Sequence, residues 1–147
     1  MIAVVQRSSK ASVKVNDNVI GNINGGLVIL LGIKKGDVEK DVEFLAQKIS
    51  TLRMFSDDSD KMNLSIKDIG GSALVISQFT LCADTRKGRR PSFVQAEVPD
   101  LSNKLYEHFK AAMVKHGIPV QSGEFGALMD VSLVNNGPVT FILDSRE

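Results

Sequence analysis

The spacing of hydrophobic residues changes several times along this chain, and the order of the changes limits the possible folds. Valine-rich alternation over 2–15 predicts a first strand, and 19–23 predicts a second. Residues 27–33 are apolar on both faces, which indicates a buried central strand. Polar turns at 16–18 and 24–26 separate the three segments. The opening of the chain is therefore predicted to be a β-meander.

Two later segments have helical spacing instead. Asp37 is expected to cap the first helix by accepting a hydrogen bond from an unpaired N–H of its first turn. The second helix is expected to begin at Pro99-Asp100, with His116 in its last turn and Gly117 in the left-handed position beyond it. Each helix has one apolar stripe, formed by Val38, Val42, Leu45, Ile49 and Leu52 in the first and by Leu101, Leu105, Phe109, Ala112 and Met113 in the second.

Strand character returns at 72–83, and two closing strands are expected at 127–134 and 139–143, joined by a turn at 135–138. The order of elements is strands, helix, strand, helix, strands. This order predicts an α+β fold, with a mostly antiparallel, curved or barrel-like β-sheet and two amphipathic helices. The whole chain, 1–147, is expected to form a single domain.

Composition favours a cytoplasmic protein. No apolar run approaches the ~20 residues of a membrane helix, and the N-terminus has the pattern of a strand, not of a signal peptide. The lone cysteine, Cys82, allows no internal disulfide and fits a reducing compartment. We expect it to be a buried structural thiol, because no nearby base is visible that would lower the pKa of its thiol.

The net charge of +1 does not by itself indicate nucleic-acid binding, but one local cluster of cations is a candidate for it. Arg86-Lys87-Gly88-Arg89-Arg90, the basic loop, places four cations within five residues. It is interpretable either as a solvated surface loop or as a contact for phosphate groups.

Familiar catalytic motifs are absent. There is no GxSxG, HExxH, CxxC, P-loop or GxGxxG pattern, and both histidines, His108 and His116, fall in the second helix. The sequence therefore predicts neither a metal ion nor a cofactor. An enzyme of this kind needs a substrate that is already reactive or that supplies part of the chemistry.

Two segments stand out from this background. Ser77-Gln78-Phe79-Thr80-Leu81 is the polar-studded end of an apolar strand, where Ser77, Phe79 and Leu81 would share one face. Asn135-Asn136-Gly137-Pro138-Val139-Thr140 contains a glycine that lets the backbone approach a ligand closely. Taken singly, the first reads equally as plain sheet and the second as a hairpin turn.

Taken together and in this order, the two segments resemble the D-aminoacyl-tRNA deacylase family. The likeness covers essentially the whole chain, and three further stretches belong to it: Val4-Val5-Gln6-Arg7, Arg90-Pro91-Ser92-Phe93 and GEFGALM at 123–129. One position departs from the family, which usually has NDGPVT where this chain has Asn136 in place of the aspartate. That substitution puts in doubt any role that needs a charge there.

The resemblance implies a homodimeric hydrolase that removes D-amino acids from tRNA, with its sites at the subunit interface. It implies that the Gly137-Pro138 bond is cis and that its carbonyl groups enter the partner's pocket, contact the α-amino group and exclude L-amino acids. It implies that Ser77, Gln78, Phe79 and Thr80 line the ester and the terminal ribose. Arg7 would support the Gly-Pro segment, and Met129 would form part of the adenosine pocket. A pocket of this kind should admit glycyl-tRNA too, because it works by excluding the L side chain.

The mechanism stays open at this point. Thr80 could attack the ester, although an unactivated hydroxyl is a poor nucleophile. Alternatively, the terminal 2′-hydroxyl of the tRNA activates water while backbone N–H groups near Phe79 and Thr80 stabilise the oxyanion; we favour this second route. Three other functions remain as alternatives: a non-catalytic RNA-binding module, a replication-associated interaction protein (a role linked to animal members of the family) and a nonspecific esterase.

Overall fold

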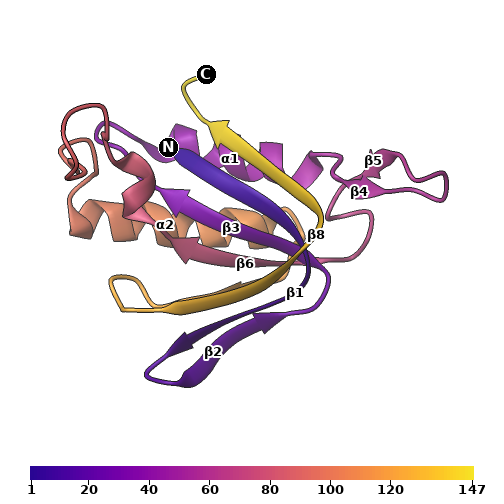
Figure 1. Ribbon diagram of the computed structural model, residues 1–147. Coiled ribbons are helices and arrows are strands. Elements are labelled where there is room, and N and C mark those ends of the chain that lie inside the picture. Colours follow the sequence, from indigo (N-terminus) through magenta and orange to yellow (C-terminus); the bar gives the residue numbers. More distant parts are fainter.

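The computed structural model describes residues 1–147 and shows one curved sheet with two helices packed against one of its faces (Figure 1). The sheet has six strands in the order β2-β1-β3-β6-β7, with β8 paired to the other edge of β1. β1 pairs antiparallel with β2, β3 and β8, whereas β6 lies parallel to β3 and β7. The predicted α+β class, the mostly antiparallel, barrel-like sheet and the two helices are therefore confirmed.

The elements run in this order: β1 (Ile2–Val15), β2 (Asn18–Ile23), β3 (Gly26–Gly32), α1 (Glu39–Thr51), β4 (Phe55–Ser56), β5 (Met62–Leu64), β6 (Ser72–Ser77), a 3-10 turn η1 (Phe79–Cys82), α2 (Pro99–Lys115), β7 (Val120–Ser122) and β8 (Asp130–Asp144). β4 and β5 form a small separate hairpin. The short β7 lies outside every strand that the sequence predicts.

The opening strands do not form the predicted meander. β2 and β3 pair with the same edge of β1: β3 with its first half and β2 with its second half. The register is the same in both halves, because Ser8 lies opposite Gly26 and Ala11 lies opposite Ile23. β2 and β3 thus form one long arm that bends at 24–25 without reversing, so the predicted second turn is a bend.

The closing strands are also continuous. β8 pairs with β1 from Asp130, opposite Lys14, to Asp144, opposite Ile2. The Asn-Gly-Pro stretch, predicted as a turn between two strands, is instead an irregularity within β8, where the register shifts around Ser8. The chain bulges there because extra residues of β8 face β1, and the antiparallel pairing on the far side of the bulge is shifted in register by two residues.

The helices bury their stripes against one face of the sheet. Val42, Leu45 and Ile49 of α1 pack together with Leu105 and Phe109 of α2 in the larger of two hydrophobic clusters. Two predicted stripe positions are wrong: Val38, which precedes the first turn of α1, is exposed, and so is Leu101. On α2 the neighbouring Ser102 is buried in place of Leu101, which shifts the buried face by one residue.

The predicted cap of α1 is also wrong. Asp37 is buried, and its carboxylate accepts hydrogen bonds from the Met1 α-ammonium (2.7 Å), the Lys34 N–H (2.7 Å) and the Arg146 guanidinium (2.7 Å). It therefore fastens the start of β1 to the segment after β8 instead of capping the helix. Asp41 takes the capping role, since its carboxylate accepts the Val38 N–H at 2.8 Å.

Two smaller predictions, on the end of α2 and on Cys82, can be checked directly. Gly117 follows α2 with a φ of +85°, the left-handed conformation expected of it, and His116 lies next to it at the end of the helix. Cys82 is buried, its Sγ lies 3.4 Å from the Ile33 carbonyl, and burial raises the pKa of its thiol. Both predictions are confirmed. Neither helix has the length and apolar character needed to cross a membrane.

Candidate functional site

The segment 77–81 leaves the sheet after its first residue. Ser77 ends β6, and the last ladder bond runs from the Gln78 N–H to the Leu31 carbonyl at 2.8 Å. Since β3 ends at Gly32, the chain has no further strand to follow and winds into η1. A Cβ on Gly32 would lie 3.0 Å from Leu81 Cβ, so this glycine lets η1 pack directly on β3. The predicted strand alternation over 77–81 is therefore wrong.

A cavity of about 480 Å³ opens where β6 meets η1. Ser77, Gln78 and Phe79 line one side of it, and Met129, in the loop before β8, lines another. The structure thus gathers four of the site residues predicted from the sequence. Thr80 is exposed and lies next to this wall, in the first turn of η1.

The side chains of η1 are held by each other and by the chain that follows. The exposed Phe79 ring packs edge-on against Phe93, with ring centroids 4.9 Å apart and planes inclined by 60°. The Gln78 amide donates a hydrogen bond to Thr80 Oγ1. The partner of the Thr80 hydroxyl is therefore a donor, which does not activate an oxygen as a nucleophile.

Backbone donors are available at the same place. Within this turn, the Leu81 N–H donates to the Gln78 carbonyl at 3.2 Å. The Ala83 N–H donates to the Thr80 carbonyl at 3.1 Å. The N–H groups of Phe79 and Thr80 precede them and have no acceptor within the turn. The one carboxylate that lines the cavity, Glu97, accepts the Val98 N–H at 2.8 Å. The site therefore offers amide donors and has no base aimed at Thr80.

A second group of predicted residues lies on β8 and β1. Arg7 Nε donates to the Asn136 carbonyl at 2.9 Å, and Arg7 Nη1 donates to the Met54 carbonyl at 3.0 Å. The Gly137-Pro138 bond is cis, as the family resemblance implies, and both residues are exposed. Gly137 has a φ of +133°, and a Cβ there would lie 2.7 Å from Val139 Cγ2 and 3.0 Å from Arg7 Nη2.

The Asn135 side chain forms hydrogen bonds with residues on the far side of the β8 bulge. Its Oδ1 accepts the Val139 N–H at 3.1 Å, and its Nδ2 donates to Thr140 Oγ1 at 3.0 Å. One side chain thus joins the two ends of the Gly-Pro excursion.

The two groups lie at opposite ends of the sheet within one chain (Figure 1). Asn135 lies opposite Ser8, Ser8 opposite Gly26, and Gly26 opposite Ser72 at the start of β6. Ser77 is at the other end of β6, and at ~3.3 Å per residue this strand separates the groups by roughly 17 Å. The structure therefore does not join the Gly-Pro segment to the η1 cavity within one protomer.

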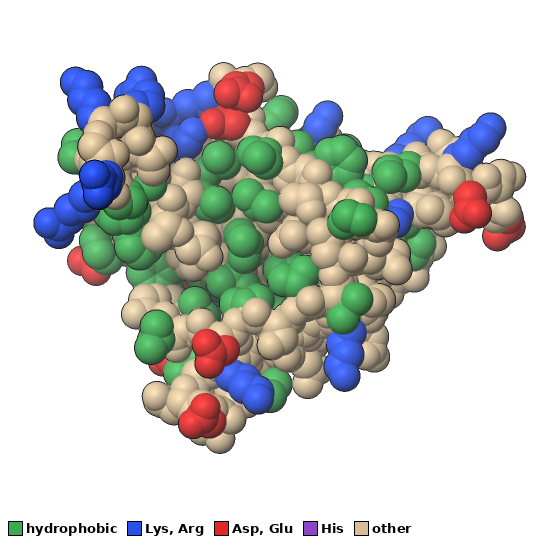
Figure 2. Space-filling model, in the orientation of Figure 1, with side chains coloured by type: hydrophobic (Ala, Val, Ile, Leu, Met, Phe, Trp, Pro, Cys, Tyr) green, Lys and Arg blue, Asp and Glu red, His purple; other side chains and the backbone are tan.

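The face of the sheet away from the helices is apolar, and the smaller hydrophobic cluster covers only part of it. Figure 2 shows hydrophobic side chains gathered over the middle of this face. Val4 lies there between its cross-strand neighbours Leu30 and Ile142, and Ile142 is 71% exposed. Exposed apolar surface of this kind is a candidate interaction site.

Sequence reasoning missed several residues that line the η1 cavity. They come from the segment before α2, from α2 itself, from the loop before β8 and from the start of β8: Ala96, Glu97, Pro99, Ser102, Phe125, Gly126, Ala127, Leu128 and Val131, together with Ile76 of β6. The signal present in the sequence is the stretch GEFGALM at 123–129, which carries part of the family resemblance; it forms a loop in which Gly126 has a φ of +77° and Leu128 is 94% exposed.

Comparison with known proteins gives consistent matches over the full chain. The family model described as D-Tyr-tRNA(Tyr) deacylase matches residues 4–144. A D-aminoacyl-tRNA deacylase of Desulfatibacillum aliphaticivorans is 57% identical over 146 residues, covering 99% of this chain and 100% of that protein. One from Bacillus pumilus is 53% identical over 147 residues and covers 100% of both.

Two solved structures have the same fold. One, described as c-Myc DNA Unwinding Element Binding Protein, has a TM-score of 0.92 and 38% identity, with 98% of each chain covered. The other, a probable eukaryotic D-amino acid tRNA deacylase, has a TM-score of 0.81 with 97% of each chain covered; its 17% identity supports likeness of fold alone.

Proposed function

Because the chain belongs to the D-Tyr-tRNA(Tyr) deacylase family and is a D-aminoacyl-tRNA deacylase, a hydrolase of the aminoacyl-tRNA ester bond, we propose that its two groups of site residues divide the work. The η1 cavity holds the ester and the terminal adenosine. The Gly137-Pro138 segment selects the D configuration. The observation that carries this proposal is the cavity that gathers Ser77, Gln78 and Phe79 with Met129. The reaction takes place in the cytoplasm, where aminoacyl-tRNA is used.

Ester hydrolysis at η1 relies on positioning and on amide donors. The Phe79 and Thr80 N–H groups, which have no acceptor within the turn, stabilise the negative charge that develops on the carbonyl oxygen. The terminal 2′-hydroxyl of the tRNA activates the attacking water, because the cavity provides no side-chain base for Thr80. An aminoacyl ester is intrinsically labile, so this arrangement is sufficient for catalysis.

Chiral selection is a task for backbone at Gly137-Pro138. Its carbonyl groups contact the α-amino group and leave no room for an L side chain, whereas every D-amino acid and glycine can enter. Arg7 fixes the segment through the Asn136 carbonyl, a contact that uses the backbone of Asn136 and needs no charge on its side chain. The replacement of the usual aspartate by Asn136 is therefore compatible with this role.

The two groups meet across a homodimer interface. Two observations support this proposal: the groups lie at opposite ends of the sheet in one protomer, and the face away from the helices carries an apolar stripe in which Leu30 and Val4 are half-buried and Ile142 is exposed. Burying such a stripe against a second copy removes apolar surface from water. Each Gly-Pro segment then reaches the η1 cavity of the other subunit.

The proposed function is tested with D-tyrosyl-, L-tyrosyl- and glycyl-tRNA side by side, in the presence of a metal chelator. We expect rapid release of D-tyrosine and glycine and background release of L-tyrosine. Equal cleavage of the D and L esters would indicate a nonspecific esterase. Background loss of all three, with binding of uncharged tRNA, would indicate a nucleic-acid-binding relative without activity; the 38% identical structure named for DNA binding is the reason to include this outcome.

Thr80→Ala is expected to keep substantial activity, within about tenfold of the wild type, because the route above does not use its hydroxyl as nucleophile. The measurement is the single-turnover rate on D-tyrosyl-tRNA, with Thr80→Val as the matched variant that keeps the side-chain shape. A fall to the uncatalysed rate in both variants would contradict the 2′-hydroxyl route and make Thr80 the nucleophile.

A further inference from the structure

A second cavity, of about 500 Å³, lies on the other side of η1. Leu81 and Cys82, the last two residues of η1, line it, whereas Gln78 and Phe79 line the first cavity. η1 therefore separates the two cavities and lines both of them. Four residues of 3-10 structure, at about 2.0 Å each, extend over roughly 6–8 Å, which is the length of about two stacked nucleotides at ~3.4 Å per nucleotide of a strand.

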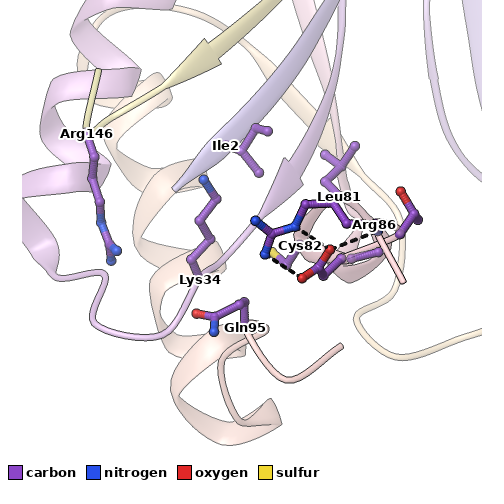
Figure 3. Close-up of a pocket in the computed structure, with 10 residues that line it drawn as sticks. Ile2, Lys34, Leu81, Cys82, Arg86, Gln95 and Arg146 are labelled. Carbon is purple, nitrogen blue, oxygen red and sulfur yellow. Dashed lines mark hydrogen bonds and ion pairs between the residues drawn. The ribbon is translucent and has the colours of Figure 1, made fainter. Parts of the chain in front are cut away.

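Cations from three separate segments surround this second cavity. Lys34 follows β3, Arg86 belongs to the basic loop after η1, and Arg146 follows β8 (Figure 3). We call this cavity with its three cations the basic cavity. The sequence shows only a run of charge along the basic loop, whereas the structure brings cations from three segments to one cavity.

Each cation is held by a carboxylate yet keeps unused donors. Arg86 gives Nε and Nη2 to the two oxygens of Asp84, at 2.9 and 2.7 Å, and these bonds hold the pKa of the Asp84 carboxyl well below its usual range. Its Nη1 has no partner. Arg146 uses Nη2 for Lys35 O and Asp37, which leaves Nε and Nη1 free. Lys34 pairs with Asp144 through one of its three protons. Free donors on pre-positioned cations suit a phosphate group.

Further cationic side chains near the basic cavity are not paired with carboxylates. Lys35, Lys87, Arg89 and Arg90 are exposed and form no salt bridge. Because the whole chain has a net charge of only +1, this end of the molecule carries an excess that the rest offsets. A local excess of this kind attracts a polyanion, whereas the bulk charge does not.

We propose that the basic cavity binds the phosphate groups of the tRNA 3′ strand immediately upstream of the terminal adenosine. The adenosine and its ester lie at Phe79 and Thr80 on one side of η1, and the strand passes over the turn so that its next phosphates reach Lys34, Arg86 and Arg146. The inference rests on the proposed function and adds to it the part of the substrate that the η1 cavity does not hold.

The test compares two substrates of one enzyme: D-tyrosyl-tRNA, and D-tyrosyl-adenosine, which has the ester but no phosphate. For Arg86→Gln we expect kcat/KM on D-tyrosyl-tRNA to fall about tenfold, through KM, as a charge-assisted hydrogen bond is lost. The slope of log(kcat/KM) against log[NaCl] should become shallower by roughly 0.7, the value for one phosphate of a single strand. Activity on D-tyrosyl-adenosine should not change, and Arg86→Lys should restore most of the lost activity.

Lys61→Gln is the matched control, since Lys61 lies on the β4–β5 hairpin at the opposite end of the molecule and forms no salt bridge (Figure 1). An equal fall on both substrates for Arg86→Gln, or no fall on D-tyrosyl-tRNA, would overturn the inference and leave the proposed function standing. If the wild type cleaved neither substrate, the proposed function would fail, and this inference with it.

Discussion

Replacing Gly137 with alanine is expected to lower kcat/KM for D-tyrosyl-tRNA at least about 100-fold, because displacing a substrate-positioning group by ~1 Å costs that much. A Cβ at Gly137 would lie 2.7 Å from Val139 Cγ2, 2.9 Å from Val139 N and 3.0 Å from Arg7 Nη2. The φ of +133° is also one that L-residues rarely adopt. The segment must therefore shift, and Arg7 must shift with it.

The variant should nevertheless fold. Backbone strain at one residue costs about 1–3 kcal/mol, against a typical total of roughly 5–15 kcal/mol. Thermal unfolding is measured beside activity, with Gly25→Ala as the control, since a Cβ at Gly25 meets nothing within 4 Å. Wild-type activity in a folded Gly137→Ala protein would remove the Gly-Pro segment from the reaction.

The same variant tests whether sites are shared between subunits. Gly137→Ala protein is mixed with Phe79→Ala protein, which is altered in the η1 cavity, and the subunits are exchanged. Shared sites predict recovery of about a quarter of wild-type activity, because half of the dimers are mixed and each has one of its two sites intact. No recovery above the two parent proteins would place each complete site within a single chain.

A substrate whose terminal adenosine lacks the 2′-hydroxyl is expected to react about 10²–10⁴-fold more slowly, the usual contribution of general acid–base assistance. The reason is local: the Thr80 hydroxyl accepts a hydrogen bond from Gln78, and Glu97, the one carboxylate of the cavity, forms no hydrogen bond with Thr80. The measurement is the single-turnover rate on D-tyrosyl-tRNA ending in 2′-deoxyadenosine.

Binding must be separated from chemistry in that experiment. The deoxy substrate is used at saturating enzyme, and its dissociation constant is measured with the uncharged deoxy-tRNA. A rate equal to that of the ordinary substrate would exclude the 2′-hydroxyl from the mechanism and return attention to Thr80. A slower rate with unchanged affinity is the result that the proposed route requires.

Local patterns predicted the elements of this fold better than its connections. The stripe of Val42, Leu45 and Ile49 predicts α1 because the spacing of a helix depends on neighbouring residues alone. Asp37 shows the opposite case: its sequence position suits a helix cap, but its carboxylate meets the Met1 ammonium and Arg146, which no local pattern reveals. The prediction of a turn at 24–26 is also wrong, because Asn and Gly occur in bends as readily as in turns that reverse the chain.

The candidate site was predictable where a motif names residues, and not where packing decides their conformation. Ser77, Gln78, Phe79 and Met129 meet in one cavity, but Phe79 stands on a 3-10 turn because β3 ends at Gly32, which the sequence of 77–81 cannot indicate. The Gly-Pro stretch resembles any hairpin turn until β1 is seen to pair with β8 on both sides of it. Phe125 and Leu128 line the cavity without any chemical signature of their own.

The pairing of β8 with the full length of β1 has a consequence for the synthesis of the chain on the ribosome. β1 emerges before every other strand and β8 after them, so one edge of β1 stays without its partner until all the other strands have been translated. Both ends of the site share this delay, because Met129 and Gly137 belong to that last stretch. Contacts between such distant parts of a sequence form slowly. The protein therefore becomes competent to act on aminoacyl-tRNA only after its last strand has been translated.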